Sequence, residues 1–551
     1  MNPLNHNNGT FANGNLTTSE PAANGAQIYA TMGSNTGKWY YEAHVEDVGT
    51  PNTGGTLIGI NPLIRPSSNI QNRTAYRSSG DIYNDSAGNS GSSAYAYVAG
   101  DTIGVAWDAD NKRLWFAKNG TWLGSGDPAG NSNSNVNYTN TETQGPFIAY
   151  DNGTGAQVTH LNFGQNPTFS GQTTAGTYTD GNGKGLFKYQ PPAGYLALCE
   201  DNLPTPTIAD PGEHFKTVLW TGDGRSFRSI TGVGFAPDFV WIRVRNAVNS
   251  SYLFDTVRGA DKALFTDLRD NENDYHGSGD GRMPSFDSDG FTVSHSSSTG
   301  TNESNDDYVA WCWKAGGAAT ANTDGSINSQ VSVNQTAGFS IVSYTGTGAN
   351  ATVGHGLGKT PNIVICKNRS DDLTNWSVNG NFGGLVYGTN KLMLQVTGGI
   401  VSDTNEVTGA NATTITLGNS SATNDTNDAQ IAYCWTEIEG FSKFGSYTGN
   451  GNVDGPFVYC GFKPAFVMTK RTDTSGEWWM YDSSRGSTNP NPRMLMANNT
   501  SVEQEDSASY LLDFLSNGFK WRSGLAASNG NGGSFIFMAF AESPFQTANA
   551  K

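Results

Sequence analysis

The sequence predicts an all-β protein made of tandem antiparallel β-sandwich domains of jelly-roll type, with one N-terminal sandwich followed by three related repeats. The first observation is a pattern that occurs three times, in which a Phe-led apolar run ends in an aromatic residue followed by Thr-Gly-x-Gly. The second is composition, because 69 glycines accompany 13 Trp, 22 Tyr and 27 Phe residues. Short strands joined by Gly-rich turns give this combination, whereas disordered chains are poor in aromatic residues.

Each repeat contains three apolar runs in the same order. The opening runs lie at 215–224, 339–348 and 441–451, the proline-led runs at 237–243, 361–367 and 464–470, and the closing runs at 308–313, 431–435 and 535–540. The proline-led and closing runs are apolar on both faces, as in strands buried between two layers. Proline is tolerated at the first position of a strand, where its missing N–H falls outside the ladder. A period of roughly 100 residues indicates duplicated domains rather than a solenoid.

These runs and the composition between them set the predicted domain boundaries. Proline-rich and polar stretches mark connectors, since proline at high density favours an extended chain. A strand is expected between the prolines of the first connector, at 195–199, and a short helix at 508–515. The predicted segments are a sandwich at 1–190, a Pro-rich linker at 191–213, repeat 1 at 214–317, a linker at 318–337, repeat 2 at 338–440 and repeat 3 at 441–551.

Charge and cysteine content restrict the expected partners. The 551 residues carry a net charge of −17, and an acidic surface repels phosphate backbones and anionic lipid, so we expect no nucleic-acid partner. Solubility alone is an alternative explanation of this net charge. The sequence start lacks the pattern of a signal peptide and no apolar run approaches about 18 residues, so we expect no membrane insertion. The five cysteines match neither a disulfide framework nor a zinc site, which favours maturation in a reducing cytosol without a cofactor or metal.

The N-terminal region contains the most specific motifs. Residues 38–46 alternate, with Trp39 on the apolar face and His44 on the opposite face, which predicts a strand with one buried face. Residues 100–122 read as a hairpin of two apolar strands joined by a polar turn at 108–112. A second hairpin turn follows at Asn119-Gly120, which favours positive φ. Closing strands follow at 146–150 and 158–164.

Three of these motifs resemble a SPRY domain: Gly37-Lys-Trp-Tyr-Tyr-Glu42, the stretch from Gly100 to Gly120, and Asn162-Phe-Gly164. The resemblance covers about residues 25–190. It implies a bent β-sandwich that recognises proteins through its loops and has no catalytic residues. The long loop at 61–94 departs from the family, so its partner-binding positions do not transfer to this chain.

The repeats resemble an uncharacterised family of β-rich modules in virion proteins of tailed bacteriophages. Three phrases carry the resemblance: Tyr308-Val-Ala-Trp-Cys-Trp-Lys-Ala-Gly-Gly317, Gly356-Leu-Gly-Lys-Thr-Pro361 and Phe537-Met-Ala-Phe-Ala-Glu-Ser-Pro-Phe545. The resemblance covers about residues 214–546. It implies a place on the virion and no particular chemistry.

We find no convincing catalytic motif in the sequence, and we expect no enzyme activity. The seven histidines show no metal-binding spacing, and no nucleophile elbow occurs. His44 and His160 alternate with apolar residues and are interpreted as residues on the solvent side of strands. The Asp-rich stretches 287–290 and 108–110 suit either a hard cation or an ordinary turn. Two Asp/Arg pairs are interpreted as structural salt bridges rather than catalytic dyads: Asp255 with Arg258, and Asp482 with Arg485.

Aromatic and basic residues in predicted loops are the candidate ligand-binding residues, because exposed rings stack on sugars or on a partner protein. They are Arg73, Tyr76, Arg77 and Tyr83 in the long N-terminal loop, and Trp122, Trp376 and Trp478 elsewhere.

These observations favour a non-enzymatic bacteriophage virion surface protein, a tail fibre or fibre-like appendage that contributes to host attachment. A capsid decoration or head fibre protein is the alternative, and a glycan depolymerase is a third hypothesis from another class. The expected partners are other virion proteins and a host surface glycan or protein receptor. We expect a homo-oligomer, such as a trimer, on the virion surface after assembly in the host cytoplasm.

Overall fold

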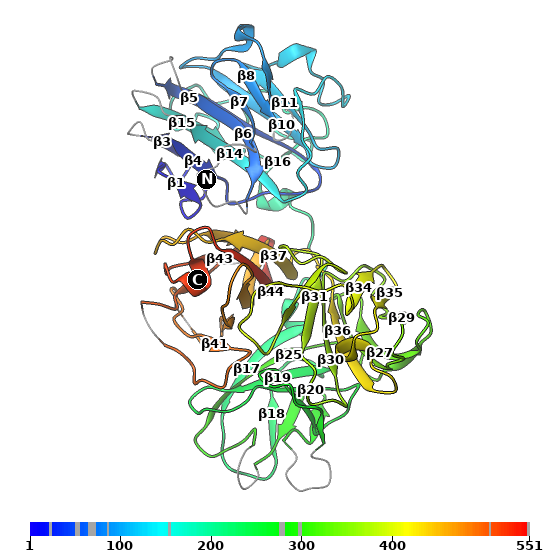
Figure 1. The fold of residues 1–551 in the computed structure, drawn as a ribbon. Coiled ribbons are helices and arrows are strands. Elements are labelled where there is room, and N and C mark those ends of the chain that lie inside the picture. The colour runs from blue at the N-terminus through cyan, green and yellow to red at the C-terminus, as the bar shows by residue number, and fades with distance from the viewer. Residues whose placement is uncertain are drawn as a thin grey trace. The chain divides into compact units, whose positions relative to one another are not determined.

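A computed structural model describes residues 1–20, 25–49, 55–63, 73–84, 88–151, 156–274, 282–295, 300–486, 488–505 and 508–547. The chain forms two compact units, Met1–Pro204 and Thr205–Lys551 (Figure 1). Their boundary lies within the stretch that the sequence marks as a Pro-rich linker.

The predicted all-β class is confirmed. Antiparallel strands dominate both units, and the α-helices among the described residues are single turns, α1 (Ser421–Asn424) and α2 (Ala526–Asn529). No helix in this part of the chain is long and apolar enough to cross a membrane. The helix predicted at 508–515 is wrong: Leu512–Leu515 is a strand, because Leu512 and Phe514 alternate into the core with a period of two.

The first unit is a sandwich of two sheets. One sheet has the order β1 (His6–Asn7), β4 (Ala26–Tyr29), β14 (Gln144–Tyr150), β6 (Thr56–Pro62), β7 (Thr74–Arg77), β8 (Asp81–Asn84), β9 (Gly88–Gly91). The other has the order β12 (Thr121–Trp122), β11 (Arg113–Lys118), β10 (Thr102–Asp108), β5 (Lys38–Val48), β15 (Gln157–Asn162), β3 (Thr17–Glu20), β2 (Thr10–Ala12), with β13 (Val136–Asn137) on β11 and β16 (Leu196–Ala197) on β5.

Strand β5 is buried on both faces, which corrects the predicted solvent side. Trp39 and its alternate neighbours enter the core between the sheets, whereas Tyr40 packs with Phe187 in a second apolar cluster on the other face. His44 and His160, predicted to face solvent, are 5% and 3% exposed. The segment after β15 folds back over this face and includes β16, which lies where the sequence predicted a strand at 195–199.

The three repeats of the second unit share one strand order. In repeat 1 it is β17 (Phe215–Thr221), β25 (Asp307–Trp313), β19 (Phe239–Val244), β20 (Tyr252–Asp255), β21 (Lys262–Phe265), β22 (Asn273–Asp274), with a small sheet of β18 (Arg228–Thr231), β24 (Gly290–Val293) and β23 (Ser285–Asp287). In repeat 2 it is β28 (Phe339–Thr345), β36 (Ala429–Trp435), β30 (Ile363–Asn368), β31 (Ser377–Gly380), β32 (Asn390–Met393), β33 (Val401–Ser402), with β29 (Ala351–Gly354), β35 (Thr414–Leu417) and β34 (Val407–Ala410). In repeat 3 it is β37 (Ser442–Thr448), β44 (Ser534–Pro544), β39 (Phe462–Arg471), β40 (Trp478–Asp482), β41 (Leu495–Met496), with β38 (Phe457–Tyr459), β43 (Gly518–Trp521) and β42 (Leu512–Leu515).

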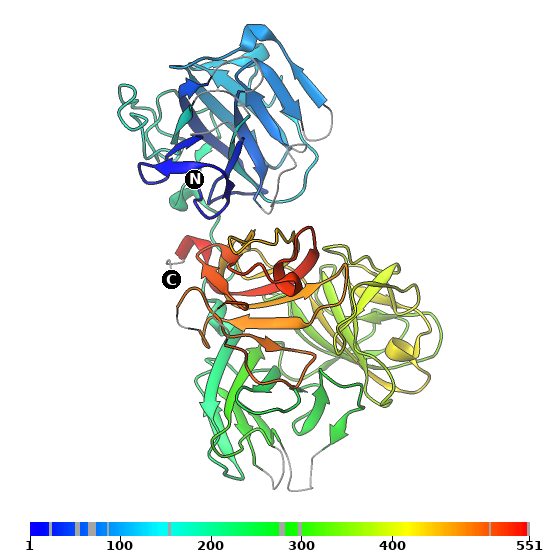
Figure 2. The ribbon, with the colours of Figure 1, turned by 60° about the vertical axis from the view of Figure 1, so that its left-hand side comes forward.

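Each large sheet packs on two apolar layers. In repeats 1 and 2, one face meets the small sheet of the same repeat in a separate core. The other face joins a single core to which all three repeats contribute, including Trp313, Trp435 and Phe540 from the three closing strands. The repeats therefore surround a common centre, as Figure 2 shows with their green, yellow and orange-red sheets. This arrangement explains why the proline-led and closing runs are apolar on both faces.

The stretch 318–337, predicted as a linker, also enters the fold. It supplies β26 (Thr320–Asn322) and β27 (Ser329–Asn334), and β27 pairs along the outer edge of β28. The alternation of Val331 and Val333 with polar residues gives this stretch the period of a strand.

A buried asparagine holds each Thr-Gly-x-Gly turn. Asn302, Asn424 and Asn529 are 0% exposed. In each repeat the Asn side-chain oxygen accepts from the residue between the two glycines, at 2.8–3.2 Å. Its carbonyl accepts from the second glycine, at 2.7–3.0 Å, and that glycine has φ near +70°. A Cβ on the first glycine would collide with the backbone after the Asn, so glycine is required at both positions.

The aromatic residue of the pattern completes this turn. Trp220, Tyr344 and Tyr447 are buried, and each donates to the carbonyl just before the Asn, at 3.2, 2.6 and 2.8 Å. The acceptors and the asparagines form Thr-Asn, Thr-Asn and Ser-Asn dipeptides, and each Asn precedes the closing strand by five residues. Because this offset is the same in all three repeats, it could have identified the Asn that binds the turn from the sequence.

Equivalent contacts join the repeats in a closed cyclic order. Arg243, Lys367 and Lys470 occupy the same position near the end of the proline-led strand, and they are 0%, 0% and 1% exposed. Each donates to a carbonyl in the loop of another repeat: Arg243 to Ser501 at 2.7 Å, Lys367 to Arg269 at 2.8 Å and Lys470 to Thr397 at 2.9 Å. Repeat 1 thus binds repeat 3, repeat 2 binds repeat 1, and repeat 3 binds repeat 2. We call this closed cycle of contacts between the three repeats the ring.

Backbone hydrogen bonds repeat this order. The donors and acceptors are Glu503 N to Arg245 O at 2.6 Å, Glu272 N to Arg369 O at 2.9 Å and Ile400 N to Thr472 O at 2.8 Å. At two joints the side chains of the same residues form ion pairs, Glu503 with Arg245 and Glu272 with Arg369. The third joint holds Ile400 and Thr472 instead, so packing and backbone bonds replace charge there.

The two predicted Asp/Arg salt bridges also lie at joints of the ring. All four side chains are 0% exposed, and Arg485 Nε lies 2.5 Å from Asp482. Asp482 also accepts from Trp311 at 3.0 Å, and Asp255 accepts from Tyr433 at 2.7 Å, so each aspartate receives a donor from another repeat. Their interpretation as structural pairs agrees with this burial.

We expect Asn424→Ala to lower the free energy of unfolding of the second unit by about 3 kcal/mol. The turn keeps the backbone bond from Gly348 N to the carbonyl of residue 424, but it loses the side-chain bonds to Thr347 N, Ala349 O and Gly418 O. Denaturant titration followed by tryptophan fluorescence measures this change. Asn419→Ala, at an exposed position of the same repeat, is the control and should unfold like the natural chain. Equal stability of the two variants would contradict the role assigned to the buried asparagine.

The ring also predicts a dependence on pH. Burial lowers the pKa of Lys367 to about 8, whereas an unfolded lysine has a pKa of about 10.4. The folded state holds this proton less tightly, so the charge opposes folding at neutral pH and this opposition fades as pH rises. Between pH 7 and pH 9.5 the natural chain should gain about 2 kcal/mol relative to Lys367→Met. A difference between the two proteins that stays constant over this range in denaturant titrations would contradict the assignment.

Candidate ligand-binding site

The stretch 61–94, predicted as a long loop, contains the strands β7, β8 and β9, with Tyr76 and Arg77 in β7 and Tyr83 in β8. The basic and aromatic residues of this stretch bind one another rather than forming an open surface. Arg73 and Arg77 lie 3.3 and 2.9 Å from the carboxylate of Asp151. Arg77 also donates to the hydroxyl of Tyr83 at 3.0 Å, and the Arg73 guanidinium lies over the Tyr83 ring. Tyr76 is 0% exposed and belongs to the core, so the expectation that it stacks on a ligand is wrong.

Trp376 and Trp478 are also buried, at 0% and 2% exposure. They occupy equivalent positions beside the proline-led strands and donate across joints of the ring, Trp376 to Phe265 O at 2.8 Å and Trp478 to Met393 O at 3.1 Å. Their predicted role in ligand stacking is therefore corrected to a role in assembling the repeats.

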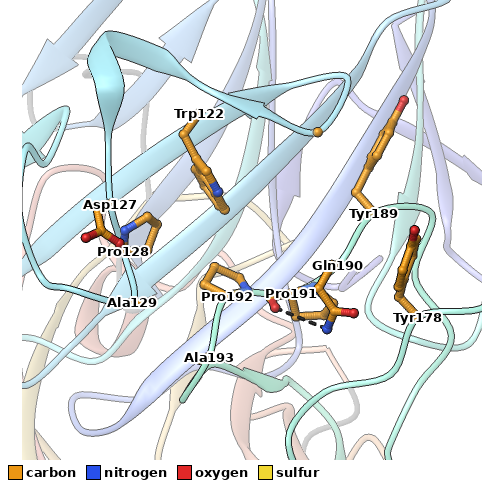
Figure 3. A pocket seen from close by; sticks show the side chains of 11 residues that line it. Trp122, Asp127, Pro128, Ala129, Tyr178, Tyr189, Gln190, Pro191, Pro192 and Ala193 are labelled. Carbon is orange, nitrogen blue, oxygen red and sulfur yellow. Dashed lines mark hydrogen bonds between the residues drawn. The ribbon is translucent and has the colours of Figure 1, made fainter.

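Trp122 alone among the predicted tryptophans lines a surface hollow. The hollow is about 410 Å³ in volume and lies in the first unit. Figure 3 shows the indole of Trp122 and the rings of Tyr178 and Tyr189 around the Gln190–Pro192 segment. The full lining is Gly120, Trp122, Asp127, Pro128, Ala129, Tyr178, Tyr189, Gln190, Pro191, Pro192 and Ala193.

Local structure fixes the Trp122 side of this hollow. Asn119 and Gly120, both at positive φ, form the hairpin turn predicted from the sequence, and Ala117 pairs with Trp122 across it. The Trp122 ring meets Tyr40 edge-on, with centroids 6.5 Å apart. Trp122 is therefore half-buried against a rigid sheet and keeps a partly exposed surface.

A buried carboxylate fixes the Tyr189 side. Glu42 is 0% exposed, and it accepts from the backbone N of Lys188 at 2.8 Å and of Tyr189 at 2.7 Å. Burial raises the pKa of Glu42, and hydrogen bonds from these amides act in the opposite direction. Tyr189 packs on the hairpin turn so closely that a Cβ at Gly120 would lie 2.5 Å from its ring. Both walls of the hollow are thus held in place before any ligand arrives.

The polar groups of the hollow lie at its surface. Asp127 and Gln190 are exposed, and Tyr178 is 45% exposed. Asp127 accepts from Gly130 N at 2.9 Å, which orders the short loop that carries it. Aromatic faces beside a carboxylate and an amide suit a ligand with apolar ring faces and hydroxyl groups.

One hydroxyl–imidazole–carboxylate chain occurs in the first unit. His160 Nδ1 lies 2.9 Å from Thr17 Oγ1, and His160 Nε2 lies 2.7 Å from Glu46. This is the connectivity of an activated nucleophile. Thr17 is 9% exposed and lies in β3, which pairs on both sides, so this chain links strands within the sheet.

The Asp-rich stretches act as turns. Asp108 accepts from the backbone and side chain of Asn111, both at 2.9 Å. Asp287 accepts from Ser285 at 2.8 Å, and Asp289 accepts from Gly234 N at 2.7 Å. Among the described residues, no group of three or more His, Cys, Asp or Glu side chains is placed to hold a metal ion.

Comparison with known families assigns the repeats to a family. A family model described as "Domain of unknown function (DUF7483)" matches residues 210–544, the part of the chain that contains all three repeats. No curated protein matches the chain.

Solved structures that are similar to part of the chain include two SPRY domains. The SPRY domain of human HERC1 is 14% identical, with coverage of 29% of this chain and 95% of that domain and a TM-score of 0.24. A human SPRY domain is 18% identical, with coverage of 28% and 95% and a TM-score of 0.22. Neither similarity bears on a ligand or partner of this chain.

Proposed function

The chain belongs to this family of unknown function, and we propose that it is a non-enzymatic virion surface protein of a tailed bacteriophage. In this proposal it is a tail fibre or fibre-like appendage, and its SPRY-like first unit binds a glycan of the host surface. The observation that carries the binding role is the hollow around Trp122, with three aromatic rings, one carboxylate and one side-chain amide. The place on the virion is supported by the phrases of the repeats that resemble phage modules.

The lining of the hollow favours binding over hydrolysis. The usual glycosidase needs two carboxyl groups on either side of the scissile bond, and among the lining residues Asp127 is the single carboxylate. An aromatic platform with a few polar groups is sufficient to hold a sugar ring. Depolymerase activity is therefore the less favoured candidate.

The repeats serve as a rigid support in this proposal. Their shared core and the ring fix three sandwiches in one body. A rigid support suits attachment, because binding several copies to one surface raises avidity when the geometry is fixed. The same support also suits a decoration protein on the capsid, which is the second candidate.

We expect Trp122→Ala to weaken binding to bacterial surface polysaccharide at least tenfold, because a stacked aromatic anchor carries a large share of such binding energy. The full chain is tested against a panel of immobilised lipopolysaccharides and capsular polysaccharides. Leu186→Ala changes an exposed apolar residue outside the hollow and should bind like the natural chain. Binding that is equal for both variants would contradict the site, and release of reducing sugar would show a depolymerase instead.

Location on the particle needs a separate test. Electron microscopy of phage particles with a gold-labelled antibody against this chain should show label on the tail. Label on the head would identify the decoration protein instead, and unlabelled particles would contradict a virion protein of either kind.

A further inference from the structure

The outer edge of β17 is equivalent to an edge that the chain itself covers in repeat 2. β17 and β28 are the opening strands of repeats 1 and 2, and both pair on one side with the closing strand. β28 pairs on its other side with all six residues of β27. Among the described residues, no strand pairs with the other side of β17, which ends its sheet.

The backbone of β17 presents N–H and C=O groups at its outer edge at the positions equivalent to those of β28. In antiparallel strands, alternate residues direct their N–H and C=O groups to opposite sides. Two hydrogen bonds bracket the pairing with β25: Gly222 N to Asp306 O at 2.7 Å, and Lys314 N to His214 O at 3.0 Å. His214 and Gly222 therefore face β25, as do the even-numbered residues between them. The backbone groups of the odd-numbered residues Thr217 and Leu219 face outward. The equivalent residues of β28, Ile341 and Ser343, pair with β27.

A hollow of about 330 Å³ lies beside the start of β17. Its walls come from repeats 1 and 3, with Thr217 on one side and Ser484 and Glu542 on the other. Thr217 is 8% exposed, and its hydroxyl is buried without a hydrogen-bond partner. A buried hydroxyl without a partner is costly, and a donor or acceptor on an added strand would satisfy it.

At the equivalent place between repeats 2 and 1, β27 is present. The hydroxyl of Ser332 accepts from Gly316 N at 2.9 Å. Val333 lies against Gly316 so closely that a Cβ there would meet the Val333 carbonyl at 2.5 Å. The covered joint thus shows what kind of strand this type of edge takes: polar side chains that alternate with valines, as in residues 330–334.

We propose that the edge of β17 binds an extended strand of a partner polypeptide, paired antiparallel to β17 as β27 is to β28. The partner strand resembles β27, Ser-Gln-Val-Ser-Val-Asn, in alternating polar residues with valines or other β-branched residues. Main-chain hydrogen bonds to Thr217 and Leu219 supply affinity, and the hollow beside Thr217 selects a small polar side chain. This surface lies in the second unit, and its function is independent of the Trp122 hollow.

The test uses the full chain and a fluorescently labelled peptide of residues 326–337, the chain's own β27 with its flanks. We expect saturable binding to the natural protein in fluorescence anisotropy. Leu219→Pro should weaken it at least tenfold, since proline removes an outward N–H and leaves the bonds to β25 in place. Leu219→Thr keeps that N–H and should bind like the natural protein. Circular dichroism and thermal melting check that both variants are folded.

Three results would overturn the proposal. The first is a peptide that does not bind the natural protein at millimolar concentration. The second is equal binding by the Leu219→Pro and Leu219→Thr variants. The third is a dimer of the natural chain in sedimentation that Leu219→Pro dissolves, because the edge would then take a second copy of this chain.

Discussion

A buried cation near the end of each proline-led strand is the constraint on which the second unit depends. Burying an ammonium or guanidinium group costs several kcal/mol unless polar groups replace the lost water. In each repeat, carbonyl oxygens from another repeat are among the groups that do so, and the acceptors of Arg243, Lys367 and Lys470 follow one cyclic order. A single repeat would lose these acceptors from its neighbour. Three repeats close the order, and this explains why they form one compact unit.

Many of the residues singled out in the sequence hold the repeats together and are buried, whereas others lie at the surface. The buried Asp/Arg pairs, Trp376 and Trp478 serve the joints, and the asparagines serve the turns. Two features that stay at the surface of the described residues are the hollow around Trp122 in the first unit and the edge of β17 in the second. The two surfaces differ in chemistry, since one presents aromatic rings and the other presents backbone groups. A chain that attaches to one object and is anchored to another needs two such surfaces.

Sequence reasoning predicted the fold class and the repeats because both depend on local periodicity, which a strand displays in its own residues. It missed contacts that depend on distant segments. His44 appeared to face solvent because the covering segment, with Phe169 and Phe187, follows more than one hundred residues later. Trp376 appeared to lie in a loop because its partner belongs to another repeat. Trp122 was placed correctly beside a tight turn, whereas its neighbours Tyr178 and Gln190 carried no local signal.

Hydrogen exchange can show whether the ring makes the three repeats one cooperative body. Amide exchange of the full chain is followed by mass spectrometry at increasing denaturant concentration, in peptides that contain the closing strands β25, β36 and β44. If the repeats unfold as one body, all three strands exchange through one common opening, with the same free energy and the same dependence on denaturant. Three separate openings with different free energies would contradict it.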